Sequence, residues 1–226
     1  MSFDFGYRES DSPLVEHIWT TTSESNAGSF ISSAACHLEM VVTKQQGNIV
    51  VTVMGPETRA KPSPIPDDAE FFGITFKIGT YLPHLPTTHL VNNGINLPDA
   101  TSRSFWFYGS AWEFPTFENA DNFLNRMVKQ GMLVRDPIVE AVLAEQGQGT
   151  DLSLRSIQRR FVHTTGLTYK MIQQIERAKK AMTLLEQGMP ILDTAFETGY
   201  YDQSHLTNAL KELMGRTPAQ IAQITP

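Results

Sequence analysis

The sequence has one cysteine, no long apolar run and few cations in its first half. Cys36 is the only cysteine among 226 residues, so no disulfide can form within the chain, and a reducing compartment suits it. No segment approaches the roughly 20 consecutive apolar residues of a membrane span. The first residues include Asp4 and Glu9 and lack the apolar core of a signal peptide. These absences argue against a disulfide-stabilised secreted protein and against membrane binding, and they predict a cytoplasmic location.

The length and the residue pattern predict two domains. With 226 residues, of which 41% are hydrophobic and 19% charged, the chain can bury a core in each of two domains. Strand-like patterns precede Phe114-Pro115-Thr116, and apolar residues recur at helical spacing after it. The predicted fold is α+β. It has a small β barrel or sandwich over residues 1–116, followed by an all-α domain of seven helices over residues 117–226.

Four segments carry the β prediction. Glu39–Thr43 and Ile49–Met54 are rich in β-branched residues and are bridged by Lys44-Gln45-Gln46-Gly47-Asn48, which indicates a hairpin. Phe72–Gly79 alternates large apolar residues with small or polar ones, as a half-buried strand does. Phe105–Tyr108 is aromatic throughout and is predicted to be a buried strand. Arg59–Asp68, with its closely spaced prolines, is expected to be an exposed connector.

Helix signals dominate the second half of the chain. Asp136-Pro137 is an N-cap followed by a proline at the first helical position, and several helices are closed by a glycine. The predicted helices cover Glu118–Gln130, a segment from Asp136 towards Gln146, the stretch between Ser153 and Gly166, Thr168–Gln187, Pro190–Thr198, Gln203–Met214 and Pro218–Ala222.

Two of these helices carry polar side chains of the kind that read DNA. Each follows an N-cap, Ser153 in one and Asp202 in the other, and each ends in glycine. Before the second, a helix ends at Gly199 and a Tyr-Tyr-Asp turn follows. This is the order of a helix-turn-helix whose second helix enters the major groove of DNA. The pattern predicts two DNA-reading units joined by the long helix Thr168–Gln187.

The charge distribution supports this prediction despite the net charge of −6. Residues 1–116 hold six Lys and Arg against 12 Asp and Glu, which predicts that this part does not approach phosphates. Residues 155–180 hold a single glutamate, Glu176, and seven cations: Arg155, Arg159, Arg160, Lys170, Arg177, Lys179 and Lys180. Since neutralised phosphates supply most non-specific affinity, we expect this stretch to provide the attraction to DNA.

These motifs resemble the DNA-binding domain of the AraC/XylS-type transcriptional regulators, in which two helix-turn-helix units are bridged by a long helix. The resemblance covers residues 152–221, about a third of the chain. The second unit supplies the family's residues as Ala195, Gly199-Tyr200, Asp202-Gln203-Ser204-His205, Leu206 and Gly215-Arg216-Thr217-Pro218. The first supplies Leu152-Ser153, Ile157, Arg159, Phe161 and Gly166. The remaining N-terminal part resembles, more weakly, the β-rich and often cupin-like sensor domains attached to such regulators.

Carried onto the matching positions, the resemblance implies a set of residues that contact double-stranded DNA. Arg155, Ser156 and Arg159 are expected at base edges, where arginine binds guanine with two hydrogen bonds. Arg160 and Lys170 are expected at phosphates. In the second unit the expected reading residues are Gln203, Ser204, Thr207 and Asn208. Asp202 is interpreted as a helix cap, and His205 as a residue that packs against its neighbours.

The chain departs from the family pattern at two places. Asn208 stands where the family usually has an arginine, so one basic contact is missing from the second unit. The segment between Ala144 and Ser153 is longer than the usual turn, which affects the placement of the first unit's supporting helix.

The N-terminal part offers no set of side chains typical of catalysis or of metal or cofactor binding. Its candidate ligand-binding residues are the aromatic side chains of Trp19, Phe72, Phe76 and Trp106, although aromatic residues in a β domain usually form the core. Cys36 and His37 are neighbours, but adjacent strand residues point to opposite faces, so they are not expected to form a nucleophile and base pair.

Three functions remain open from the sequence. The leading interpretation is a transcriptional regulator, not an enzyme, whose N-terminal domain binds a small-molecule effector or forms a homodimer. The second is a protein that binds DNA constitutively or under the control of a protein partner. The third is a DNA-repair alkyl acceptor centred on Cys36, with the helices as its targeting module. Under the leading interpretation, a fragment beginning near Glu118 is expected to bind DNA by itself.

Overall fold

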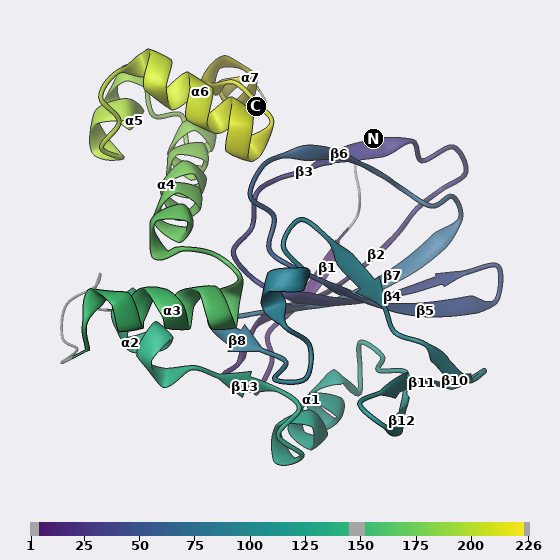
Figure 1. Cartoon of the computed structure of the whole chain (residues 1–226). Coiled ribbons are helices and arrows are strands. Elements are labelled where there is room, and N and C mark those ends of the chain that lie inside the picture. Colours follow the sequence, from purple (N-terminus) through teal and green to yellow (C-terminus); the bar gives the residue numbers. More distant parts are fainter. Residues whose placement is uncertain (1–4, 145–151, 224–226) are drawn as a thin grey trace. The chain divides into compact units, whose positions relative to one another are not determined.

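The structure, a computed structural model, describes residues 5–144 and 152–223, and in these ranges it contains 13 strands and seven α-helices (Figure 1). Nearly all strands precede the helices, which confirms the predicted fold class. The chain packs as two compact units. Unit 1 comprises Met1–Gly28, His37–Pro56 and Ile65–Thr168, and unit 2 comprises Ser29–Cys36, Glu57–Pro64 and Tyr169–Pro226. The chain therefore passes between the units five times, and none of these crossings is at residue 116.

Unit 1 is built on an antiparallel sheet of six strands. Their order is β1 (Gly6–Arg8), β2 (Val15–Thr22), β7 (Ala69–Phe76), β4 (Glu39–Gln45), β5 (Asn48–Met54) and β9 (Gly94–Asn96). A second sheet holds β10 (Asp99–Thr101), β11 (Ser104–Phe107) and β12 (Ser110–Glu113), and β8 (Thr80–Tyr81) pairs with β13 (Val134–Arg135). The short helix η1 (Thr87–His89) follows β8.

The predicted hairpin is confirmed as β4 and β5, with Gln45 opposite Asn48. Its two-residue turn, Gln46-Gly47, has φ values of 50° and 82°, as the turns that suit the twist of a hairpin require. The predicted strand Phe72–Gly79 is confirmed in part, as β7. The prediction for Phe105–Tyr108 was wrong in one respect: β11 alternates, so Phe105 and Phe107 are buried while Trp106 is 47% exposed.

The core of unit 1 lies between the six-stranded sheet and α1 (Ala120–Lys129). The sheet contributes Ile18, Met40 and Ile74, all fully buried, and the helix contributes Leu124 and Met127. The helix turns this face inward because its apolar residues recur every three or four positions. Burial of these side chains supplies most of the free energy that holds the unit together.

Unit 1 also holds α2 (Pro137–Ala144) and α3 (Leu154–Thr165). The Oδ1 atom of Asp136 accepts hydrogen bonds from the backbone N–H groups of Ile138 and Val139, at 2.9 and 3.1 Å, so the predicted N-cap is confirmed. Its Oδ2 atom pairs with Arg160 on α3 at 2.9 Å. One buried carboxylate therefore closes the first turn of α2 and ties this helix to α3.

Unit 2 contains α4 (Tyr169–Glu186), α5 (Ile191–Glu197), α6 (Gln203–Met214) and α7 (Pro218–Ala222). The last two have the predicted bounds. Gly188 and Gly215, with φ of 85° and 72°, follow the ends of α4 and α6 in the left-handed conformation that glycine adopts at low cost.

Two strands from the first third of the sequence complete unit 2. β3 (Ser29–Ser32) pairs antiparallel with β6 (Lys61–Pro64). The interpretation of Arg59–Asp68 as an exposed connector was therefore wrong for Lys61–Pro64, whereas Pro66, Asp67 and Asp68 are exposed as predicted. β6 is an edge strand in this pair, and a proline on its unpaired side gives up no ladder hydrogen bond. We call Ser29–Cys36 and Glu57–Pro64 together the β3–β6 ribbon. A fragment that begins at Glu118 would lack it.

Replacement of Asp136 by alanine is expected to lower the free energy of unfolding by about 1–2 kcal/mol, because it removes the cap of α2 and the partner of Arg160. Arg160→Ala should cost no more than about 1 kcal/mol, since that side chain is 45% exposed and water screens the pair. Urea denaturation followed by tryptophan fluorescence measures both, because all three tryptophans lie in unit 1 with Asp136. Equal losses in the two variants would contradict the dominant role of the cap.

Candidate nucleic-acid interface

The outer face of α3 presents the arginines of the first predicted reading helix. Arg155 and Arg159 are exposed and one helical turn apart, whereas Ile157 and Phe161 are buried on the opposite side. The hydroxyl of Ser153 accepts a hydrogen bond from the backbone N–H of Ser156 at 3.3 Å, which confirms the predicted cap. The side chain of Ser156 lies beside this cap, with its hydroxyl 3.0 Å from that of Ser153.

The inner side of α3 packs on elements of the β-rich region. The rings of Tyr81 on β8 and His163 on α3 meet at 5.7 Å between centroids, with 66° between their planes. Gly166 ends the helix at φ 72°, and a Cβ atom there would lie 2.7 Å from Val91 and 3.1 Å from the carbonyl oxygen of Thr87. The first reading helix is therefore part of unit 1, and its orientation there depends on β8 and η1.

The second helix-turn-helix lies within unit 2 and is formed by α5, a short turn and α6. Gly199 takes φ 72° after α5, and the side chain of Asp202 accepts a hydrogen bond from the backbone N–H of His205 at 2.7 Å. The ring of His205 meets that of buried Tyr200 edge to face, with 5.1 Å between centroids. The predicted cap and the predicted packing role of His205 are both confirmed.

The face of α6 that points away from the core carries the predicted polar residues. Gln203, Ser204 and Asn208 are exposed, and the half-buried Thr207 donates its hydroxyl to the carbonyl oxygen of Gln203 at 2.8 Å. Leu206, Leu210 and Leu213 are buried on the other side. These four polar side chains share one helix face and can offer amide and hydroxyl groups to base edges.

The basic stretch of residues 155–180 is less available than its sequence indicates. Lys179 pairs with Glu176 at 3.1 Å, and Lys180 pairs with Glu197 of α5 at 3.3 Å. The guanidinium of Arg177 lies 4.3 Å from the centre of the Tyr200 ring. The charge count missed these pairs because two of the partners come from residues about 20 positions later. Of these contacts, only the Lys180–Glu197 pair joins α4 to α5, and it uses a cation of the stretch that is expected to attract DNA.

Arg155, Arg159 and Lys170 are exposed cations of the stretch. Within residues 5–144 and 152–223, no ion pair involves any of the three. Arg160, by contrast, is held by Asp136. The segment between Ala144 and Ser153 is longer than the usual turn and is expected to affect the placement of the first unit's supporting helix. It lies largely outside the described residues.

The four aromatic residues named as ligand candidates have different surroundings. Phe72 and Phe76 are buried in the core. Trp19 lies across Gly73, where a Cβ atom would be 2.1 Å from the indole ring, and its Nε1 donates to Glu39 at 3.3 Å. Trp106 is on β11 in the smaller sheet. A role of these four in ligand binding stays a prediction.

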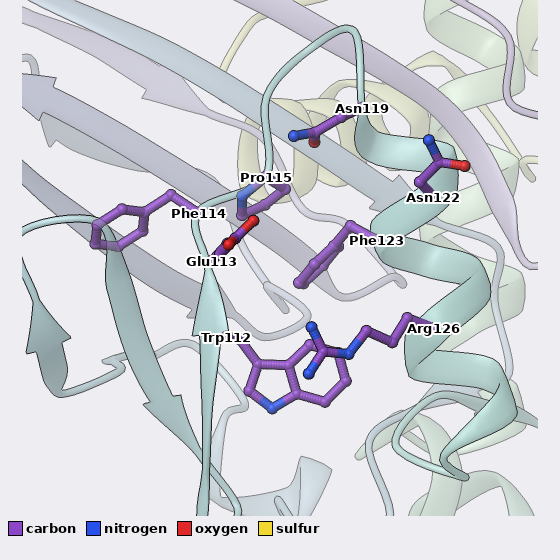
Figure 2. Close-up of a pocket in the computed structure, with 8 residues that line it drawn as sticks. All are labelled: Trp112, Glu113, Phe114, Pro115, Asn119, Asn122, Phe123 and Arg126. Atoms are coloured by element: carbon purple, nitrogen blue, oxygen red, sulfur yellow. The ribbon is translucent and has the colours of Figure 1, made fainter.

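A pocket of about 290 Å³ lies between β12 and α1 (Figure 2). Its lining combines aromatic, amide and charged groups: Trp112, Glu113, Phe114, Pro115, Asn119, Asn122, Phe123 and Arg126. The guanidinium of Arg126 lies over the indole of Trp112, 4.5 Å from the ring centre, and the Phe123 ring meets that indole edge to face. In the sequence, the aromatic residues of this segment were the only sign of a pocket here.

The described residues were also compared with the requirements of a metal site and of a membrane span. In the part of the chain that the structure describes, no three His, Cys, Asp or Glu side chains come together in a way that could hold a metal ion. The helices in the same ranges include none that is both long and apolar enough to cross a membrane.

Comparisons with known proteins bear on the helical region. Residues 148–224 match the family model described as a helix-turn-helix domain. ToxT from Vibrio cholerae O395 aligns at 10% identity and a TM-score of 0.44, over 98% of this chain and 98% of that chain. Apo ToxT K231A from Vibrio cholerae strain SCE256 aligns at 9% identity and 0.43, over 97% and 100%. No curated protein sequence matches. The family-model match therefore identifies a helix-turn-helix domain within residues 148–224.

Proposed function

We propose that the chain is a sequence-specific transcriptional regulator that reads duplex DNA with α3 and α6. The observation that carries the proposal is the face of α6, on which four polar side chains point outward from a helix that is capped by Asp202 and preceded by the turn at Gly199. The arginines of α3 add a second exposed face of the same kind. A helix of this sort places its first turns at base edges in the major groove.

The two reading helices have different chemistry and should contribute differently to binding. The guanidinium groups of Arg155 and Arg159 can each donate two hydrogen bonds to guanine, and their positive charge attracts phosphates. Gln203 and Asn208 are neutral and suit adenine, while the Thr207 methyl suits the methyl group of thymine. We therefore propose that α3 supplies most of the salt-dependent affinity and that α6 mainly supplies specificity.

Replacement of three cations by alanine tests this assignment. Arg159→Ala should cost about 1–3 kcal/mol of binding free energy and relax specificity at one base position. Lys170→Ala should weaken binding evenly across sequences and reduce the salt slope by about one. Lys179→Ala is the matched control on α4, because its ammonium group already pairs with Glu176. Gel-shift titrations at several salt concentrations measure all three variants. Unchanged operator binding by Arg159→Ala would remove α3 from the interface.

We further propose that residues 1–116 regulate binding by residues 117–226, in a cytoplasmic protein that responds to a small molecule or to self-association as a homodimer. The acidic character of residues 1–116 supports this division, because repulsion keeps them from phosphates. The pocket between β12 and α1 supports the small-molecule form. Its aromatic walls, the amide of Asn122 and the guanidinium of Arg126 suit a small carboxylate that carries a ring or an apolar chain.

Thermal melting against a panel of aromatic and aliphatic carboxylates tests for an effector. A carboxylate that binds only the folded chain should raise the melting temperature, and the rise should shrink in Arg126→Ala. Arg103→Ala, in the turn between β10 and β11, is the control for loss of an exposed arginine elsewhere. A carboxylate that acts as effector should also change the affinity for DNA. If no member of the panel shifts either quantity, the constitutive or partner-controlled alternative is favoured.

The alkyl-acceptor alternative depends on Cys36, and the surroundings of this residue argue against it. The side chain is 2% exposed. Burial is the main cause that raises the pKa of the thiol to about 12; the charge of Lys179 opposes this rise, and Glu176 adds to it. Since the thiolate is the nucleophile, a thiol that stays protonated is a poor one.

Cys36 in the native chain should therefore react slowly with iodoacetamide at pH 8, and it should react at the rate of a free thiol once the chain is unfolded in guanidinium chloride. Intact mass spectrometry follows both reactions. Incubation of the native chain with methylated DNA provides the decisive comparison, because transfer of one methyl group to Cys36 would revive the alkyl-acceptor function.

A further inference from the structure

The C-terminal end of α6 is completed by the β3–β6 ribbon. A helix leaves its last carbonyl groups without partners inside the helix. Here the carbonyl oxygen of Glu212 accepts a hydrogen bond from the backbone N–H of Ala60 at 2.8 Å, and that of Leu213 accepts one from Ala34 at 2.7 Å. The hydroxyl of Ser33 lies 3.5 Å from the carbonyl oxygen of Met214, the last helical residue. Three consecutive carbonyl groups of the second reading helix thus face donors from residues 33–60.

Side chains of the ribbon lie close to the glycine that follows α6. Gly215 has φ 72°, and a Cβ atom there would lie 2.5 Å from Ile31 Cγ2 and 3.1 Å from Ala60 Cβ. The ribbon therefore contacts α6 on both of its strands. Gly215 therefore has two roles: it ends α6 in the left-handed conformation, and its lack of a side chain leaves room for the ribbon.

The ribbon is itself held in a defined shape. Buried Glu57 accepts a hydrogen bond from the Ser32 hydroxyl at 2.6 Å, pairs with Lys61 at 2.8 Å and forms a bridge with Ala35. Cys36, the last residue of the first ribbon segment, is buried, and the charge of Glu176 on α4 contributes to the raised pKa of its thiol. A displaced ribbon would break this whole set of contacts, so the ribbon acts on α6 as one body.

Each strand of the ribbon continues at both ends into residues of unit 1. β3 is preceded by Gly28, after β2, and Cys36 is followed by His37, which leads into β4. Glu57 follows Pro56, after β5, and Pro64 leads through Ile65 into β7. The strands that meet the ribbon are four of the six in the large sheet. A change in these strands reaches the donors to α6 through short connecting segments: Ala34 is five positions from the start of β4, and Ala60 is six positions from the end of β5.

We propose that the β3–β6 ribbon is the positioning element of the second helix-turn-helix, through which the large sheet controls how α6 binds DNA. The proposal rests on the proposed function, since it assumes that α6 reads DNA. Ala34 and Ala60 are positioning residues: their N–H groups fix the end of the helix, while the side chains at its other end contact the bases. An effector or a second copy of the chain that alters the sheet acts on α6 by this route.

Ala60→Pro tests the proposal because it removes the N–H group that donates to Glu212, and Ala60→Ser is the matched control that keeps this group. The probe is a duplex that the wild-type chain selects from a random-sequence pool, and the readout is a footprint with a binding titration. Ala60→Pro should bind about tenfold more weakly, which is about 1.4 kcal/mol. It should lose protection over the half of the site read by α6 and keep protection over the other half. Ala60→Ser should stay within twofold of wild type.

A footprint of Ala60→Pro equal to that of wild type would overturn the proposal. So would an equal loss over both halves, which a merely structural role predicts.

If Ala60→Pro fails to fold, hydrogen exchange on the wild-type chain tests the proposal instead. The amides of Ala34 and Ala60 should exchange as slowly as those of α6 and slow further when DNA binds. Fast exchange at both, with α6 protected, would show that the ribbon does not hold the helix. A wild-type chain that selects no DNA would instead refute the proposed function.

Discussion

The unsatisfied backbone groups at helix ends are the constraint on which both reading helices depend. Each reading helix is short, and a short helix is stable only when its terminal N–H and C=O groups find partners. Ser153 and Asp202 supply the first partners, and glycine in the left-handed conformation closes each helix. At the end of α6 the chain goes further, since backbone donors from a distant ribbon reach the last carbonyl groups. The proposed DNA-binding surface is therefore positioned by atoms that lie outside it.

The parts of the fold that rest on local signals were predictable from the sequence. The caps at Asp136, Ser153 and Asp202 and the bounds of α6 and α7 follow from short-range rules for helix ends, so they were found where predicted. The β4–β5 hairpin follows from its turn for the same reason. The β3–β6 ribbon was missed because its two strands are separated by the whole hairpin and because closely spaced prolines resemble a loop. Only the pairing with β3 makes Lys61–Pro64 a strand.

The candidate interface was predictable in its residue types but not in the availability of its charges. A charge count treats each cation as free, whereas the structure pairs Arg160 with Asp136 and Lys180 with Glu197. These partners lie 24 and 17 positions away along the chain, beyond the reach of helix spacing rules. The pairs hold α2 against α3 and α4 against α5. Part of the positive charge that a DNA-binding domain is expected to expose is therefore used to assemble its helix pairs.

The division into two units changes how the link between the reading helices should be understood. α4 bridges the two helix-turn-helix units in sequence, yet it packs with α5–α7, while α3 packs with β8 and η1. A helix that packs within one unit fixes geometry inside that unit only. The chain between α3 and α4 is three residues long, and the ribbon supplies four more covalent links between the units. Under the proposed function and the proposed role of the ribbon, control of DNA binding needs no signal along α4: a ligand that favours one arrangement of the large sheet would act on α6 through the ribbon and on α3 through β8. Such a ligand shifts the binding equilibrium by no more than its own difference in affinity for the two arrangements.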